Sequence, residues 1–302
     1  MERKRKSSQT SSFGVSKREN HNSEQFYNSN IYATIGLNAV VDKKENAIPL
    51  ECLNSIFCHT SECMRELADN SVHLMITSPP YNVTKEYDQN LTLESYLSLL
   101  ENVMKETYRV LVDGGRACIN IANVGRKPYI PLSDYISKLM NEIGFNYRGE
   151  IIWDKSASAG GSCAWGSWMS ASNPSLRDVH EYILVFSKGN LARKKNIQKE
   201  NTISRDDFLE WTKSIWRMNT ESAKRVSHPA PFPLELPHRL INLYSFKGDV
   251  VLDPFMGSGT TAVAALQNGR NYIGYDIDEN YITIANKRIE KAKAELANKK
   301  LF

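Results

Sequence analysis

One segment combines hydrogen-bond acceptors, prolines and an aromatic ring: residues 77–82 read TSPPYN and directly follow the apolar run VHLMI. The Ser78 hydroxyl and the Pro79 carbonyl are two acceptors that can hold the N–H groups of an amine on an aromatic ring. Such an amine is a poor nucleophile because its lone pair is conjugated into the ring, and held N–H groups turn that lone pair toward an electrophile. The prolines stiffen the loop, and Tyr81 supplies a face for stacking an extruded base. The segment thus predicts group transfer to an exocyclic amine by the catalytic residues Ser78, Pro79, Pro80 and Tyr81.

A second candidate site lies far along the chain, where residues 249–266 read DVVLDPFMGSGTTAVAAL. The order is strand, glycine loop, helix, and Gly257 and Gly259 allow close approach of a ligand to the backbone. The loop lacks the Gly-Lys-Ser/Thr of a phosphate loop, and Ala262 stands where a dinucleotide site has its third glycine. A nucleoside without phosphates, such as S-adenosylmethionine (SAM), fits better. Asp276, at the end of the next strand, is placed to accept hydrogen bonds from ribose hydroxyls. The predicted cofactor contacts are Asp253, Pro254, Phe255, Gly257, Ser258, Gly259, Thr260 and Asp276.

The elements that must position both sites alternate between strands and helices, which predicts an α/β fold with a parallel sheet covered on both faces. Helices are expected from apolar periodicity at residues 91–111, 132–143, 207–217, 234–244, 260–267 and 279–298. Strands are expected at residues 55–58, 72–77, 117–121, 147–153, 180–186, 249–252 and 271–275. The Asp-Gly-Gly at 113–115 predicts a turn, and residues 156–174 predict a long loop.

Composition narrows the class of protein. The chain has 302 residues, 41% of them hydrophobic, and a formal net charge of +4. Five cysteines, odd in number and irregularly spaced, argue against a disulfide framework, and no spacing suggests a metal site. No apolar stretch is long enough to cross a membrane and the basic start is not a secretory signal, so we expect a cytoplasmic protein. Residues 1–28 are expected to form a disordered basic arm, either without a role or touching DNA phosphates.

Together these motifs resemble those of SAM-dependent DNA amino-methyltransferases. DPFMGSGTT resembles the SAM motif of that family, HPAPFPLELPHRLI at 228–241 its preceding motif, and SPPY its catalytic motif. The catalytic motif precedes the SAM motif in this sequence, so the chain resembles the beta arrangement of the family. That arrangement includes restriction–modification enzymes. The resemblance covers roughly residues 55–298 and implies a doubly wound, mostly parallel seven-stranded sheet, circularly permuted, with both motifs on adjacent central strands. It also implies cofactor contacts from Phe232 and Glu62.

The resemblance implies a substrate as well. In the family, serine at the first catalytic position usually accompanies transfer to N4 of a flipped cytosine, and aspartate transfer to N6 of adenine. A covalent route to cytosine C5 is disfavoured, because none of the cysteines follows a proline in a loop at a strand end. Adenine N6 remains the alternative, followed by RNA or protein amide methylation and by a catalytically dead DNA-binding protein.

The remaining expectations concern organisation and partners. We expect two halves of a methyltransferase domain, residues 29–187 (catalytic) and 228–302 (SAM-binding), around an inserted target-recognition region at 188–227 whose basic residues suit phosphate contacts. Double-stranded DNA is the expected partner, with a cognate restriction endonuclease and a homodimer as further possibilities. The expected DNA contacts are Trp153, Lys155, Lys194, Lys195 and Arg217. Trp153 is equally well explained as a core side chain.

Overall fold

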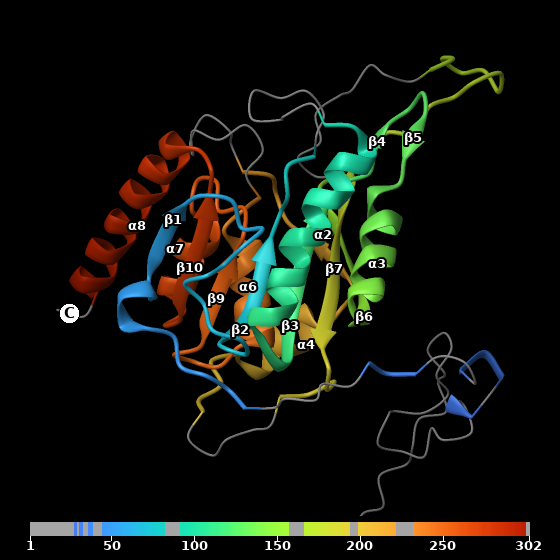
Figure 1. Cartoon of the computed structure of the whole chain (residues 1–302). Coiled ribbons are helices and arrows are strands. Elements are labelled where there is room, and N and C mark those ends of the chain that lie inside the picture. The colour runs from blue at the N-terminus through green and yellow to red at the C-terminus, as the bar shows by residue number, and fades with distance from the viewer. Residues whose placement is uncertain are drawn as a thin grey trace, which may run out of the picture. The chain divides into compact units, whose positions relative to one another are not determined.

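The chain divides into two compact units, Met1–Asn38 and Ala39–Phe302 (Figure 1). The computed structural model describes residues 27–28, 30–32, 36–38, 44–81, 91–156, 166–193, 199–221 and 232–299. The described part of the first unit holds a short 3-10 helix, η1 (Asn30–Tyr32), and the Tyr27 and Tyr32 rings meet edge to face at 5.2 Å. The predicted arm lies almost wholly outside the described residues. Among those that are described, no helix has the length and apolar character needed to cross a membrane.

An eight-stranded sheet forms the centre of the second unit, in the order β1-β10-β9-β2-β3-β7-β6-β8. All neighbouring strands are parallel except that β7 runs against both β3 and β6. This confirms the predicted α/β fold with a mostly parallel sheet. The strands in chain order are β1 (Ser55–Cys58), β2 (Val72–Thr77), β3 (Leu111–Ile121), β6 (Phe145–Asp154), β7 (His180–Lys188), β8 (Ile215–Arg217), β9 (Val250–Asp253) and β10 (Asn271–Asp276). A separate two-stranded sheet pairs β4 (Val124–Gly125) with β5 (Tyr129–Ile130).

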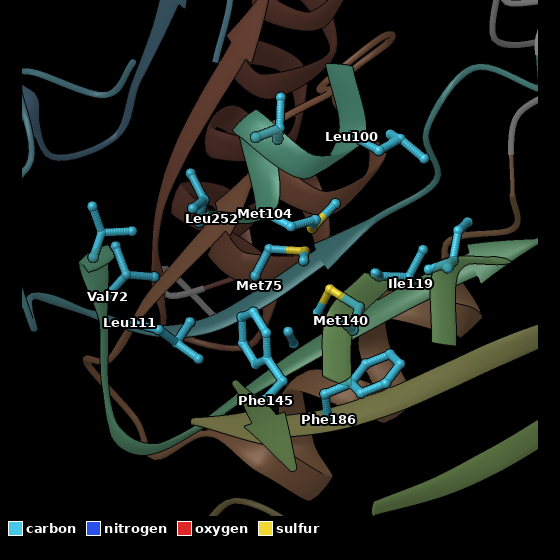
Figure 2. Packing of buried hydrophobic residues seen from close by; sticks show 14 of the residues in the cluster. Val72, Met75, Leu100, Met104, Leu111, Ile119, Met140, Phe145, Phe186 and Leu252 are labelled. Atoms are coloured by element: carbon cyan, nitrogen blue, oxygen red, sulfur yellow. The ribbon is translucent and has the colours of Figure 1, made fainter. Parts of the chain in front are cut away.

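Helices cover both faces of this sheet, which is why β2 is buried along its whole length. Met75 packs into a cluster with α2 and α3, whereas Leu74 and Ile76 pack into another with α6, α7 and α8. Figure 2 shows part of the first cluster, where Met75, Met104 and Phe145 converge from different elements. The helices are α2 (Leu93–Val110), α3 (Leu132–Ile143), α4 (Arg205–Trp211), α6 (Glu235–Tyr244), α7 (Thr260–Gln267) and α8 (Glu279–Lys299). A short 3-10 helix, η2 (Leu50–Cys52), precedes β1.

Two helix boundaries follow directly from local sequence. Thr92 begins α2 by accepting a hydrogen bond from the Ser95 backbone N–H, which satisfies one of the unpaired donors of the first turn. Gly144 ends α3 in the left-handed region, at φ 112°, and its N–H bonds to carbonyls of the last turn. The predicted bounds of α3 and α7 match the structure; α3 ends at Gly144, and α7 begins directly after Gly259.

Two local predictions are wrong. The Asp-Gly-Gly at 113–115 does not turn the chain: β3 continues through it, and Val72 and Leu74 of β2 pair with Leu111 and Arg116, so the additional residues form a bulge. The predicted helix 207–217 ends at Trp211, and Ile215–Arg217 form β8 instead. Trp216 is buried in β8 between exposed neighbours, a two-residue alternation, and pairing with β6 outweighs the helical period. This strand is the eighth of a sheet expected to have seven.

The direction of the strands defines two edges of the sheet. Every strand except β7 ends at one edge, which we call the carboxyl edge, and β7 begins there with His180. The opposite, amino edge carries the starts of β2 and β9 and the end of β7. In open α/β sheets ligands bind beyond the carboxyl edge, so both predicted sites should lie there.

Candidate active site

The Ser-Pro-Pro-Tyr segment follows the carboxyl end of β2, between the ends of β9 and β3. Pro79 is buried, whereas Ser78 and Tyr81 are half-buried. The Ser78 hydroxyl donates to Tyr81 Oη at 3.3 Å, and the Tyr81 hydroxyl donates to Glu181 Oε2 at 2.8 Å. Two of the predicted catalytic residues, Ser78 and Tyr81, are therefore joined to a carboxylate on β7 by a continuous chain of hydrogen bonds.

Two of the side chains in this network, Asn120 and Glu181, are absent from the sequence prediction. Asn120 lies near the end of β3, and its Nδ2 group is 2.6 Å from Glu181 Oε2, 3.2 Å from Tyr81 Oη and 3.5 Å from Ser78 Oγ. Lys155 Nζ donates to Glu181 Oε1 at 2.7 Å. Asn120 and Glu181 are polar residues in or beside otherwise apolar strands, whose sequences are ACINI for Asn120 and EYILVF for Glu181. A polar residue in such a strand is the signal that could have identified both. We call Ser78, Tyr81, Asn120, Lys155 and Glu181 the amine-site network.

The network also fixes the protonation state of the phenol. Burial, and then the negative charge of Glu181, raises the pKa of Tyr81 well above its ordinary value. Tyr81 therefore remains a neutral hydrogen-bond donor at physiological pH.

Asp253 ends β9 beside β2 and organises the entrance of the glycine loop. Its buried carboxylate accepts from Thr77 Oγ1 at 2.7 Å, from Thr261 Oγ1 at 2.6 Å and from the Phe255 N–H at 3.1 Å. The Thr77 bond joins the strand of the catalytic segment to the strand of the glycine loop. Burial raises the pKa of Asp253 to about 7, although the two threonine bonds act in the opposite direction.

The glycine loop leaves no room for side chains at its critical positions. Gly257 and Gly259 have φ angles of 50° and 79°, in the left-handed region. A Cβ on Gly259 would lie 2.8 Å from the Ala285 Cβ on α8, and a Cβ on Gly274 of β10 would lie 2.2 Å from Met256 Cε. The lack of a side chain at Gly259 and Gly274 therefore allows the loop to pack directly against α8 and β10.

Ser258 and Thr260 were predicted as cofactor contacts, and both meet Arg288 of α8. Its Nη1 group donates to the Ser258 carbonyl at 2.5 Å, to Ser258 Oγ at 2.8 Å and to Thr260 Oγ1 at 3.1 Å. A guanidinium thus ties the loop to the last helix. Sequence reasoning missed Arg288 because it lies amid the other charged residues of a long terminal helix.

Asp276 ends β10 at the same edge and faces the loop. Its Oδ2 atom accepts from the Gly257 N–H at 2.8 Å, and Oδ1 accepts from the Asp278 N–H at 2.9 Å. Burial raises the pKa of Asp276, while these backbone bonds oppose the shift. The next residue, Ile277, is 61% exposed. A carboxylate followed by an uncovered aliphatic side chain is a combination suited to a nucleoside, because one binds hydroxyls and the other a flat base.

The predicted contact Glu62 lies just beyond β1. Its carboxylate accepts from Asn102 Nδ2 of α2 at 2.9 Å and from Thr60 Oγ1 at 3.1 Å. The neighbouring Ser61 donates its hydroxyl to the Pro254 carbonyl at 2.9 Å, which brings this loop against the glycine loop. The two predicted aromatic contacts, Phe255 and Phe232, are half-buried and pack against the first and second core clusters respectively.

The predicted DNA contacts occupy different environments. Trp153 belongs to the core: it is 2% exposed, and its indole N–H donates to the Met218 carbonyl at 2.9 Å. Of the two roles considered for it, the structure matches the core side chain. Lys155 is held by Glu181. Arg217 ends β8 at the carboxyl edge with its side chain 87% exposed, against Asp154 at 3.3 Å. Lys194 and Lys195 lie outside the described residues.

Several cations of the predicted target-recognition region are engaged at the amino edge. Lys188 is buried, and its ammonium donates to Asn70 Oδ1 and to the Leu111 carbonyl, each at 2.7 Å. Arg193 and Lys199 both pair with the buried Asp249, just before β9. The expectation that the basic residues of this stretch serve phosphate contacts is wrong for Lys188, whose charge is satisfied inside the protein.

Comparison with known proteins identifies relatives along most of the chain. Residues 72–287 match the profile of the N6_N4_Mtase family, described as DNA methylase. The type II methyltransferase M.MthZI of Methanothermobacter thermautotrophicus is 32% identical over 277 residues, which cover 80% of this chain and 78% of the relative. M.MjaI of Methanocaldococcus jannaschii, also a type II methyltransferase, is 32% identical over 269 residues, covering 75% and 88%.

Solved structures agree with the sequence comparison. The Thermus thermophilus protein TTHA0409, determined in complex with S-adenosyl-L-methionine, is 32% identical with a TM-score of 0.61 and covers 75% of this chain and 90% of that one. The PvuII DNA methyltransferase, described as cytosine-N4-specific, has the same TM-score at 20% identity, covering 80% and 90%, and shows the shared fold. With a matching profile over most of its length and relatives of this identity, the chain belongs to the N6/N4 DNA methylase family, whose members are DNA amino-methyltransferases.

Proposed function

We propose that this protein transfers a methyl group from SAM to N4 of a cytosine flipped out of double-stranded DNA, as the modification enzyme of a restriction–modification system. One observation carries the proposal. The Ser-Pro-Pro-Tyr segment and the glycine loop follow adjacent strands, β2 and β9, and the Thr77–Asp253 hydrogen bond joins those strand ends. An amine held by the first and a methyl donor held by the second would meet at one edge of the sheet.

The residues around the glycine loop fit the methyl donor. Gly257 and Gly259 leave the backbone open to close approach, and Asp276 has a carboxylate at the strand end where ribose hydroxyls would bind. Ile277 offers an exposed apolar side chain for the adenine. We assign Glu62, Phe232 and the loop residues Asp253 to Thr260 to the same site, some as direct contacts and others, such as Asp253, as supports of the loop. When bound, SAM supplies an electrophilic methyl on a sulfonium.

The residues at the end of β2 fit the acceptor amine. Ser78 Oγ and the Pro79 carbonyl accept its N–H groups, and the ring of Tyr81 stacks on the extruded base. The Glu181 bond supports this role, because it fixes the phenol and with it the plane of the ring. Serine at the first position favours cytosine N4, and adenine N6 is the alternative on the same scaffold.

Duplex DNA would approach the carboxyl edge. Arg217, exposed at the end of β8, is suited to a phosphate contact there, within a target-recognition region that we propose at 188–227. Lys194 and Lys195 directly follow Arg193, which pairs with Asp249 at the opposite, amino edge, so we do not assign them to this contact. The type II methyltransferase names of M.MthZI and M.MjaI support a restriction–modification setting in the cytoplasm of a bacterium or archaeon, with a cognate endonuclease. A homodimer is a further proposal.

The test of this function is direct. The protein is expressed beside a plasmid, the plasmid is digested to nucleosides, and the nucleosides are separated by mass spectrometry. N4-methylcytosine above the empty-vector level is the expected result. N6-methyladenine instead would show that the target base is adenine, and the assignment of the site residues would stand. Unmodified DNA would refute DNA methylation.

A further inference from the structure

Methyl transfer to an amine releases a proton, and no residue has yet been assigned as the acceptor of that proton. The sulfonium carbon forms a bond to the amine nitrogen as its bond to sulfur breaks, and sulfur keeps the electron pair. The nitrogen must then lose one proton to end as a neutral methylamine. A buried site needs a group within hydrogen-bond reach to take that proton.

We propose that the proton passes from the amine to Ser78 Oγ, while Ser78 hands its own proton to Tyr81 Oη and Tyr81 hands its own to the Glu181 carboxylate. This inference rests on the proposed function and adds its missing base. Each transfer follows a hydrogen bond already directed that way, at 3.3 Å from Ser78 to Tyr81 and 2.8 Å from Tyr81 to Glu181. Ser78 and Tyr81 end as they began, and Glu181 ends as a carboxylic acid, so atoms and charge balance.

The other polar groups at this edge are poorer acceptors. Asn120 is an amide without a basic site, and its Nδ2 group donates to the oxygens of the chain. Asp253 is a carboxylate, but its hydrogen bonds run to Thr77, Thr261 and the Phe255 N–H, and none among the described residues reaches Ser78. Glu181 is thus the carboxylate at the end of the amine-site network.

Asn120 and Lys155 hold the Glu181 carboxylate in position beside Tyr81. The amide of Asn120, only 2% exposed, donates to Glu181 Oε2, and the Lys155 ammonium donates to Oε1. The Glu181 side chain is 12% exposed and that of Lys155 is 20% exposed, so the carboxylic acid can afterwards lose its proton to water. Glu181 acts through Tyr81 and does not touch the base, which makes it a positioning residue that also receives the proton.

The experiment measures single-turnover methylation of plasmid DNA by the full chain. Glu181→Gln keeps an oxygen for the Tyr81 hydroxyl but removes the basic site, and the rate should fall by about 100-fold while SAM binding is unchanged. Tyr81→Phe keeps the ring but interrupts the chain. Because the two residues act in one chain, the double variant should be no slower than the slower single variant. Glu106→Gln is the matched control, since Glu106 pairs with Arg109 on α2 away from the amine-site network, and it should methylate at the wild-type rate.

Chemical rescue separates a proton acceptor from a structural support. In Glu181→Ala, added formate should restore much of the rate, and formamide, which has nearly the same size but no basic oxygen, should not. Equal rescue by both, full activity of Glu181→Gln, or independent losses in the double variant would overturn the proposal. A wild-type protein that methylates no amine in the same assay would instead overturn the proposed function, so the two failures are distinguishable.

Discussion

Substitution of Gly259 by alanine tests the close approach between the glycine loop and the last helix. Gly259 has φ 79°, and a Cβ there would lie 2.8 Å from the Cβ and 3.1 Å from the Cα of Ala285. The second of these atoms belongs to the backbone of α8, which cannot rotate away. Alanine at this position would therefore strain its own backbone and push α8 from the loop.

The expected loss of stability combines these two effects. The left-handed conformation costs alanine about 1–2 kcal/mol, and overpacking costs about 1–3 kcal/mol. The reduced entropy of the unfolded chain offsets about 0.4–1 kcal/mol of this. We expect Gly259→Ala to lower the free energy of unfolding by about 1–5 kcal/mol on these values.

Gly248→Ala is the matched control. Gly248 has φ 81°, but a Cβ there would meet nothing within 4 Å, so only the backbone strain remains and the loss should be about 1 kcal/mol. Urea unfolding measures both losses, and calorimetry should show weaker SAM binding in Gly259→Ala alone. Equal destabilisation of the two variants would refute the packing of α8 against the loop.

Three further predictions concern charge at the two edges of the sheet. The pKa of Asp253 is raised from 3.8 to about 7, so the folded state holds this proton more tightly than the unfolded state. The free energy of unfolding that this group contributes is therefore present at low pH and is lost as the pH rises from about 4 to 7. Asp253→Asn should remove that component from the pH dependence of urea unfolding, and an unchanged difference between wild type and variant across this range would contradict it. Arg217→Ala should lower the slope of log affinity for DNA against log salt by about 1, whereas Lys199→Ala at the amino edge should leave it unchanged; equal slopes would move the DNA contact elsewhere. Asp276→Ala should weaken SAM binding by about 10- to 100-fold in calorimetry while DNA binding persists, and retained SAM affinity would exclude a ribose contact.

The sequence predicts this fold well where the signals are local. The strand, glycine loop and helix from β9 through α7 were recognisable because their order and their glycines are consecutive. The apolar run of β2, ended by two prolines, likewise predicts a strand buried on both faces. The bounds of α3 follow from its apolar period and from Gly144.

Sequence reasoning failed where distant segments determine the structure. Glu181 lies 100 positions from Tyr81, and only the pairing of β7 with β3 brings its carboxylate to the phenol. The pattern around Trp216 is too short to reveal that it pairs with β6. Similarly, a count of basic residues cannot show that Arg193 meets a buried aspartate at the amino edge.

In the proposed reaction, the segment after β2 presents an exocyclic amine to SAM held by the glycine loop. The most direct test of this reaction uses purified protein, plasmid DNA and SAM with a deuterated methyl group, followed by nucleoside mass spectrometry of wild type and Ser78→Ala. We expect the deuterated methyl on N4 of cytosine with the wild-type protein, and loss of that product in Ser78→Ala while SAM binding remains. Wild-type transfer to a ring carbon, or undiminished transfer by Ser78→Ala, would contradict it.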